Sequence, residues 1–373
     1  MAGDADAPAT GAADEASAAL EPENVARLDV SGMAAAIAEL PRQLTAGYAV
    51  ARETLAGGGF DERPAALVAC GMGGSAIGAD LVLACLPELP VPATVVRGYR
   101  VPAWVGAGTL LVAASYSGQT EETLACAAAA LEQGCRPVCI ASGGALGELA
   151  AAHGLTLVRV PGGGQPRAAV GYLAAPLLAA VEAAGLADGV AAQVDEAAAV
   201  LRAGNERYGP LRPAGDGPGE NAAKALALRL FKRQAVVYGA GLTVPVARRW
   251  KGQVNENAKA PAFWNELPEL DHNELMGWTS LPHVAASTVA VFLDDPQADP
   301  RLARRAELTA AELQALGVAV EHVRAEVGSP LARLFSLVQF GDYVSFYLAV
   351  LYGVDPTPVQ AIQDFKAKLA GPA

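Results

Sequence analysis

The sequence of 373 residues contains few of the residues that build disulfide frameworks and metal cages, with five cysteines and four histidines. They are scattered along the chain: the closest cysteines are Cys135 and Cys139, and no CxxC pair occurs. These absences exclude a disulfide-stapled fold and argue against a zinc cage. We therefore predict a reducing compartment, the cytoplasm.

Positive charge is also scarce, because 27 Lys and Arg stand against 39 Asp and Glu and give a formal net charge of −12. Such a field repels phosphate backbones and anionic membranes, so we predict neither a nucleic-acid partner nor a membrane partner. No unbroken apolar run of about 18 residues is present to span a bilayer. The start of the chain lacks the basic and apolar regions of a signal peptide. We expect residues 1–24, which are acidic and rich in alanine, to form a disordered tail.

The material for a large core is present, because 52 % of the residues are hydrophobic and only 18 % are charged. The length suggests about two domains. Short apolar runs alternate with helical patterns over 65–160, and the alternation restarts at 222. This order predicts an α/β fold, in which parallel sheets carry helices on both faces. We expect an N-terminal domain with leading helices over 25–207, a Gly- and Pro-rich linker over 208–221 and a C-terminal domain over 222–373. The expected strands cover 65–70, 94–96, 110–114, 137–140, 155–160, 234–238, 287–293 and 319–323.

Two of the expected strands in the first half run into turns rich in Gly, Ser and Thr that start helices. The first turn reads CGMGGSAIG over 70–78, and the second reads SYSGQTEET over 115–123. Ligands of parallel sheets bind beyond the carboxyl ends of strands, and the free N–H groups of a helix start favour anions there. One such turn could be a simple helix cap, but two on neighbouring strands favour a phosphate pocket. The expected phosphate-binding residues are Gly74, Ser75, Ser115, Ser117 and Thr120.

Three further residues could supply chemistry. Arg167 follows a proline just before a helical pattern, where it could clamp an anion or an oxyanion, or be a solvated arginine. Glu256 and His272 lie in RWKGQVNENAK and DHNE, which are polar segments in an apolar chain, as is typical of functional sites. A glutamate can carry a proton to and from carbon, and a histidine can serve as acid or base on oxygen. The alternatives are an ion pair of Glu256 with Lys259 and a surface role for His272.

Six motifs together resemble one family. They read GMGGSAIGAD, ASYSGQTEETL, QPRAAVGY, RWKGQVNENAK, DHNE and VDPTPVQAIQDFKAKL. In this order, from Met33 to Leu369, they resemble the archaeal and bacterial bifunctional phosphoglucose/phosphomannose isomerases of the sugar isomerase (SIS) superfamily. The resemblance implies two tandem SIS domains and a homodimer with its site at the subunit interface. It implies no metal and no cofactor.

The resemblance also implies a role for each candidate residue. The serines and the threonine of the two turns would hold the phosphate of the sugar, together with the neighbouring backbone N–H groups. Glu256 would move the proton between C1 and C2, and Arg167 would stabilise the enediolate. His272, from the neighbouring subunit, would open the sugar ring. Lys366 would assist ring opening near the ring oxygen.

The function expected from this resemblance is an aldose–ketose isomerase. It would interconvert fructose 6-phosphate with glucose 6-phosphate, mannose 6-phosphate or both, through a cis-enediol(ate). We hypothesise that the hydroxyl of Thr357 influences which epimer is accepted. The alternative is a catalytically silent SIS-type sensor of sugar phosphates that regulates a partner protein. An aminosugar synthase would need an N-terminal Cys, whereas the first cysteine here is Cys70. A zinc-dependent mannose phosphate isomerase would need clustered ligands that the sequence lacks.

Overall fold

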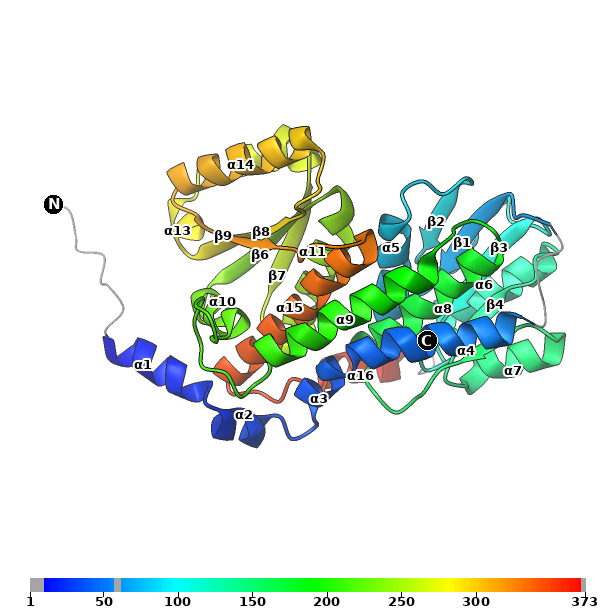
Figure 1. Ribbon diagram of the computed structural model, residues 1–373, viewed down its shortest axis with the longest axis horizontal. Helices are drawn as coiled ribbons and strands as arrows, with labels where there is room; N and C mark the ends of the chain where they lie inside the picture. The colour runs from blue at the N-terminus through cyan, green and yellow to red at the C-terminus, as the bar shows by residue number, and fades with distance from the viewer. Residues whose placement is uncertain (1–9, 57–61, 370–373) are drawn as a thin grey trace.

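The computed structural model describes residues 10–56 and 62–369. They form two parallel sheets that lie side by side and are joined by long helices (Figure 1). The first sheet has the strand order β2-β1-β3-β4-β5, and the second has the order β7-β6-β8-β9. Every strand pair in both sheets is parallel. The predicted α/β class with parallel sheets is confirmed.

The first half of the chain builds the first sheet and the long helices beside it. Its elements are α1 (Thr10–Ala19), α2 (Pro22–Leu28), α3 (Met33–Ala38), α4 (Leu40–Leu55), β1 (Ala66–Cys70), α5 (Gly73–Cys85), β2 (Ala93–Val96), β3 (Thr109–Ala114), α6 (Glu121–Glu132), β4 (Val138–Ala141), α7 (Gly144–His153), β5 (Leu157–Arg159), η1 (Pro166–Ala168), α8 (Val170–Ala183) and α9 (Val190–Tyr208). Alternate residues of β1 face opposite ways. Leu67 packs in the cluster that contains α8, and Val68 packs in the cluster that contains α6. Both faces of the sheet are therefore covered, which explains why its strands read as continuous apolar runs.

The second half builds the second sheet in the same manner. Its elements are α10 (Ala222–Leu230), β6 (Gln234–Ala240), η2 (Gly241–Thr243), α11 (Val244–Asn257), β7 (Ala262–Leu267), η3 (Glu269–His272), α12 (Glu274–Gly277), α13 (Pro282–Ala286), β8 (Thr288–Asp294), α14 (Pro300–Ala315), β9 (Ala319–Arg324), α15 (Pro330–Leu351) and α16 (Gln360–Leu369). The sequence pattern assigned no strand to 262–267. This segment is an edge strand with four of its six residues partly or fully exposed, so it lacks the apolar run that marks the buried strands.

Helix α15 lies at the centre of the molecule, between the second sheet and helix α9 (Figure 1). It is the one helix of the described residues that is long and apolar enough to cross a membrane, and the whole of that apolar stretch is buried inside the protein. Side chains of α15 share one hydrophobic cluster with α4, α8 and α9. This shared core connects the two sheets.

The expectation of a disordered tail over residues 1–24 is wrong for the part that the structure describes. Residues 10–19 form α1, and α2 begins at Pro22. Leu20 is 2 % exposed and packs in the main core together with Val25, so burial of these side chains offsets the entropy lost on ordering the segment. Residues 1–9 lie outside the described residues. The division into domains at 208–221 stays a prediction; the described chain has no helix or strand between Tyr208 and Ala222.

Candidate active site

The two Gly/Ser/Thr turns lie beside each other at one edge of the first sheet. Strands β1 and β3 are parallel neighbours with Cys70 opposite Ala113, so both turns leave the sheet at its carboxyl edge. The backbone N–H of Tyr116 donates to the hydroxyl oxygen of Ser75 at 3.3 Å. The turns are therefore in direct contact, as their positions after adjacent strands predict.

The second turn is held together by its own hydroxyl groups. Ser115 is fully buried, and its hydroxyl donates to the Oγ1 atom of Thr120 at 2.8 Å. The N–H of Thr120 donates back to the Ser115 oxygen at 3.3 Å. The Ser117 oxygen accepts from the N–H of Gln119 at 3.2 Å, and Ser117 is exposed. Four of the five predicted phosphate residues thus lie in a compact group, and Ser117 lies at its solvent side.

The first turn also packs tightly against the segment that carries Arg167. A Cβ atom at Gly74 would lie 2.7 Å from the carbonyl oxygen of Pro166, so any other residue would push the turn and η1 apart. Because of this close approach, the start of α5 and the arginine lie next to each other.

Arg167 is 4 % exposed and makes hydrogen bonds with all three of its guanidinium nitrogens. Its Nε atom donates to Asn257 Oδ1 at 2.6 Å, and its Nη2 atom donates to the carbonyl oxygens of Pro356 and Thr357 at 2.8 and 2.7 Å. Burial lowers the pKa of Arg167, and the nearby charge of Glu256 opposes this effect. An arginine stays protonated under such conditions. The alternative of a solvated arginine is wrong.

Glu256 lies in the last turn of α11 and faces the same place. Its Oε2 atom is 3.4 Å from Nη1 of Arg167, and its side chain is 34 % exposed. Lys259 does not bind this carboxylate: its Nζ atom donates to the backbone oxygens of Glu256 and Pro356. The expected alternative, an ion pair with Lys259, is therefore replaced by a pair with Arg167.

A cavity of about 330 Å³ lies between the start of the first turn, Arg167 and Glu256. The hydroxyl residues Ser75, Ser115, Ser117 and Thr120 are not part of its lining. Its lining includes Gly74, Arg167 and Glu256, so α5, η1 and α11 each contribute a wall. Arg248 and Lys251 add further positive charge to the lining. A chain with a net charge of −12 thus concentrates basic side chains at this cavity, which is what an anionic ligand requires.

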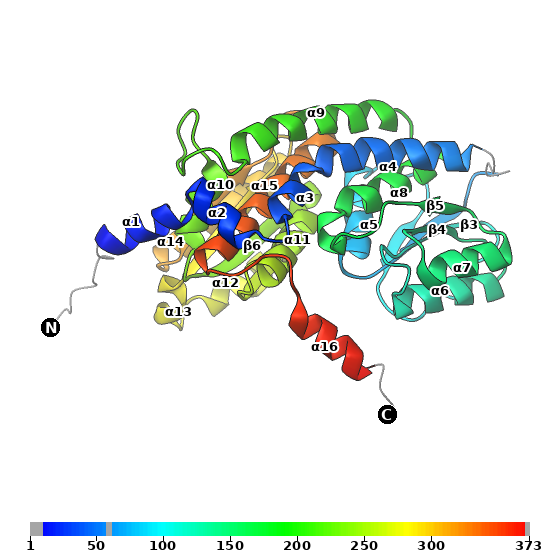
Figure 2. The same ribbon diagram turned by 90° about the horizontal axis from the view of Figure 1, so that it is seen from below.

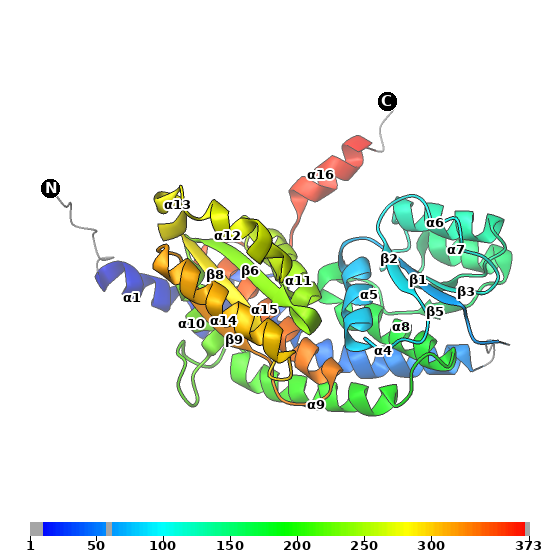
Figure 3. The same cartoon turned by 90° about the horizontal axis from the view of Figure 1, so that it is seen from above.

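His272 and Lys366 lie elsewhere. His272 is the last residue of η3 and is exposed, and Lys366 is an exposed residue of α16. Neither belongs to the lining of the cavity around Glu256. Helix α16 projects away from the body of the molecule (Figures 2 and 3) and has no buried residue. Within one chain, the structure brings Gly74, Arg167 and Glu256 to one cavity, places the second turn against the first, and leaves His272 and Lys366 apart.

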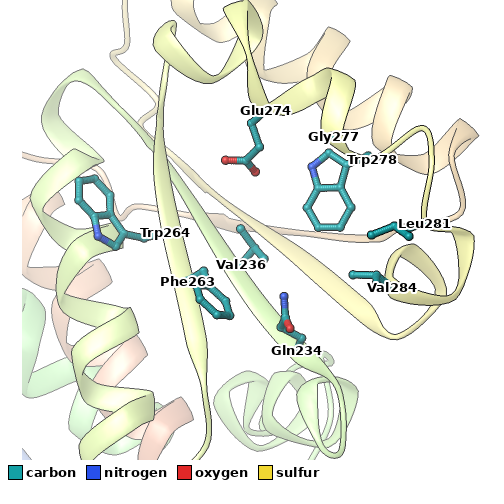
Figure 4. A pocket seen from close by; sticks show the side chains of 9 residues that line it. All are labelled: Gln234, Val236, Phe263, Trp264, Glu274, Gly277, Trp278, Leu281 and Val284. Carbon is teal, nitrogen blue, oxygen red and sulfur yellow. The ribbon is translucent and has the colours of Figure 1, made fainter.

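The DHNE motif also contributes to a second cavity, of about 410 Å³, beside the edge strand β7 (Figure 4). The carboxylate of Glu274 points into this mainly apolar space between aromatic side chains (Figure 4). It accepts hydrogen bonds from the hydroxyl of Tyr238 and from Nδ2 of Asn265. Glu274 therefore connects α12 to the second sheet.

Two residues that the sequence did not single out hold the site together. Asn257 contacts Arg167 directly, and Asp342 on α15 pairs with Arg249 at 2.7 Å. Asn257 lies in the polar NEN segment, which gave a signal. Asp342 lies in the long apolar helix α15. An acidic residue among apolar ones was the only sign in the sequence that an ion pair is buried there.

The fold defines a class, the SIS-type α/β proteins, in which parallel sheets carry helices on both faces. A solved structure titled hypothetical protein TT0462 from Thermus thermophilus superimposes with a TM-score of 0.71 at 18 % identity and covers 97 % of this chain and 95 % of that one. The tagatose-6-phosphate ketose/aldose isomerase from Escherichia coli superimposes with a TM-score of 0.62 at 15 % identity, over 87 % of this chain and 95 % of that one. At these identities the likeness concerns the fold alone.

The family follows from sequence similarity. Residues 219–369 match the family described as bacterial phospho-glucose isomerase C-terminal SIS domain. A bifunctional phosphoglucose/phosphomannose isomerase from Caldicellulosiruptor bescii is 42 % identical over 82 % of this chain and 89 % of its own length. A protein of the same name from Aquifex aeolicus is 36 % identical over 81 % of this chain and 90 % of its own length. The chain belongs to the bifunctional phosphoglucose/phosphomannose isomerase family and is an isomerase.

Proposed function

We propose that this protein is an aldose–ketose isomerase that interconverts fructose 6-phosphate with glucose 6-phosphate, mannose 6-phosphate or both, through a cis-enediol(ate). The observation that carries the proposal is the pairing of the Glu256 carboxylate with the buried guanidinium of Arg167 in a cavity bordered by the Gly74 turn. Such a site offers a base, a fixed positive charge and an anion-binding turn within one cavity.

In the proposed reaction the two turns bind the phosphate, and Glu256 takes the proton from one of the carbons C1 and C2 and returns it to the other. Negative charge then develops on the sugar oxygens, where Arg167 stabilises it. The Nη1 atom faces the base and also donates to Oε1 of Gln165 at 3.2 Å, whereas Nε and Nη2 are bound to Asn257 and to backbone carbonyls. Its contact with Glu256 is long, at 3.4 Å, so a sugar oxygen can compete for this N–H group.

We further propose that the site is completed in a homodimer. His272 would come from the partner subunit to open the sugar ring, and Lys366 would assist near the ring oxygen. The exposed apolar face of α16 supports an assembly: Ile362, Phe365 and Leu369 are 42, 64 and 61 % exposed and are spaced along one side of the helix. Lys366 follows Ile362 by one helical turn, so a partner that covers this face also brings Lys366 to an interface.

The hydroxyl of Thr357 is a candidate for the choice between glucose and mannose epimers. Its Oγ1 atom is buried and has no hydrogen-bond partner within the described residues. The backbone oxygen of the same residue binds Arg167, so the hydroxyl is near the proposed reacting groups. A sugar hydroxyl could satisfy this atom.

A coupled isomerase assay tests the function against the alternative of a silent sensor. We expect turnover of fructose 6-phosphate by the wild type, and a loss of roughly 10⁴-fold in Glu256→Gln with fructose 6-phosphate binding retained, because the amide cannot accept the proton. Glu312→Gln, an exposed residue of α14, is the matched control and should leave the rate unchanged. Since we propose chemistry without a metal, a chelator should also leave the rate unchanged. Binding without turnover by the wild type would favour the sensor.

A further inference from the structure

Asn257 is adjacent to Glu256 in the sequence and binds the same guanidinium, but its side chain is buried whereas that of Glu256 is partly exposed. Asn257 is fully buried between α11 and α15, and it makes hydrogen bonds on both sides of its amide. The Oδ1 atom accepts from Nε of Arg167 at 2.6 Å, and the Nδ2 atom donates to Oγ of Ser345 at 3.0 Å. One residue thus joins the proposed oxyanion-stabilising arginine to the central helix.

Ser345 determines which way this amide is turned. Its hydroxyl donates to the backbone oxygen of Asp342 at 2.8 Å, so its hydrogen is already used and its oxygen acts as an acceptor towards Asn257. An amide flipped by 180° would set the Asn257 oxygen against the serine oxygen and its NH₂ group against the Arg167 N–H. The fully buried serine therefore favours the orientation in which the amide oxygen meets the arginine.

All three nitrogens of the Arg167 guanidinium are bonded: Nη1 donates to Oε1 of Gln165 at 3.2 Å as well as to Glu256, and Asn257 is the residue that holds Nε. Nη2 binds the carbonyls of Pro356 and Thr357 at one end of the guanidinium, and Asn257 binds Nε at the other. Two anchors at different nitrogens hold a planar fork in one orientation. That orientation directs Nη1 towards the Glu256 carboxylate.

We propose that Asn257, oriented by Ser345, is a positioning residue that holds the Arg167 guanidinium where it stabilises the enediolate. This inference rests on the proposed function, since it assigns Asn257 to the same reaction. Asn257 acts through the arginine and does not touch the sugar. Its removal therefore lowers kcat and leaves substrate binding nearly unchanged, because the phosphate is held by the turns after β1 and β3.

The kinetic test compares Asn257→Ala with Asn255→Ala, which removes the same side chain from the same helix two residues earlier. Asn255 donates to the backbone oxygen of Ala260 and does not contact Arg167. We expect Asn257→Ala to lower kcat roughly 30- to 300-fold, with KM for fructose 6-phosphate changed less than about threefold, while Asn255→Ala stays within about threefold in both. In the double variant with Arg167→Ala, Asn257→Ala should cause no further loss of kcat. The effects of two substitutions are not additive when one residue acts through the other.

A multiplicative loss in the double variant, or an equal loss in Asn255→Ala, would overturn the inference, since either result would mean that Asn257 acts independently of the arginine. Should Asn257→Ala fail to fold, Ser345→Ala carries the same test, with an expected loss in kcat of about 3- to 10-fold. An unchanged kcat in folded Ser345→Ala would then contradict the orienting role.

A readout without turnover separates this inference from the proposed function. In nitrogen-15 spectra, the buried Arg167 Nε–H should give a protected signal in the wild type and in Asn255→Ala. Arg167→Lys identifies the signal by its absence. Loss of protection in Asn257→Ala supports the positioning contact even if the wild type turns over no hexose phosphate. Retained protection would overturn it even if the enzyme is active.

Discussion

The residues proposed for catalysis fall into two groups that differ in how the chain holds them. Arg167 and Glu256 lie in contact in a cavity, with the Gly74 turn packed against the arginine segment. His272 and Lys366 are exposed, on η3 and α16. The contrast shows that packing within one chain assembles the proton-transfer half of the proposed site and leaves the ring-opening half on the surface. In our proposal, a second copy of the chain brings the two halves together.

The two exposed residues also differ from each other. Segment η3 is fixed to the body of the protein, because Asp271 pairs with Arg305 at 2.7 Å and accepts a hydrogen bond from Thr309 at 2.8 Å. His272 is thus presented from a rigid position. Helix α16 has no such anchor and no buried residue, so its apolar face needs a partner surface. We expect dimer formation to order Lys366 more than His272.

Mixing two inactive variants gives the largest effect expected from this comparison. Glu256→Gln and His272→Asn should each lose activity by roughly 10³-fold or more. If His272 acts in the partner's site, random mixing of the subunits creates one intact site in each mixed dimer and restores about 25 % of the wild-type activity.

No recovery after verified subunit exchange would contradict a shared site, because a histidine acting within its own chain leaves both sites of a mixed dimer defective. His283→Asn, an exposed histidine of α13, is the matched control. When His283→Asn is mixed with Glu256→Gln, the activity should not exceed that of the same amount of His283→Asn measured alone.

Arg167→Lys tests the half of the site that one chain assembles. Lysine retains the positive charge but has a single nitrogen, so it cannot bind Asn257, the carbonyls of Pro356 and Thr357 and the sugar together. We expect kcat to fall roughly 10²- to 10³-fold, measured in the coupled assay. Arg304→Lys, on the exposed face of α14, should have no effect. Full activity in Arg167→Lys would show that charge alone suffices.

The sequence predicted where the two turns lie better than it predicted contacts between distant segments, and the roles of His272 and Lys366 stay predictions. The two turns followed from the rule that neighbouring parallel strands end at one edge, and the structure places β1 and β3 side by side. The contact between Arg167 and Glu256, 89 residues apart, had no local signal, because it depends on how α11 packs against η1. Strand β7 was missed because an edge strand does not need an apolar run. The tail was misjudged because alanine-rich composition did not reveal that Leu20 is buried.

Ser115→Ala should have a smaller effect, on substrate affinity. The serine hydroxyl binds Thr120 and its oxygen accepts from the Thr120 N–H, so its loss loosens the second turn. We expect KM for fructose 6-phosphate to rise about 10-fold with kcat reduced less than about threefold. Ser287→Ala, outside the turns on the second half of the chain, serves as the control. A fall in kcat without a change in KM would assign Ser115 to the chemistry.

The smallest expected effect is on stability. Like His272, His322 is an exposed histidine, but it forms a side-chain contact within its own chain, with Asp294. The Oδ2 atom of Asp294 lies 2.9 Å from Nδ1 of His322. The hydrogen bond to this carboxylate raises the pKa of His322 above its ordinary value of 6.5. The stabilisation is fully present below the pKa of the unfolded chain and is lost as pH rises through the raised folded value. His322→Gln should therefore lower Tm by about 1–3 °C at pH 5.5 and by less at pH 8.5. Equal changes at both pH values would exclude this contact as the cause.

Transfer of hydrogen at C2 of the sugar phosphate tests the assignment of Glu256 most directly. In deuterated water, proton spectra should show the wild type replacing the C2 hydrogen of glucose 6-phosphate, of mannose 6-phosphate or of both, with deuterium. Glu256→Gln should leave that hydrogen in place while still binding the sugar phosphate. Continued exchange at C2 in folded Glu256→Gln, at a rate near that of the wild type, would contradict the role of this carboxylate as the base.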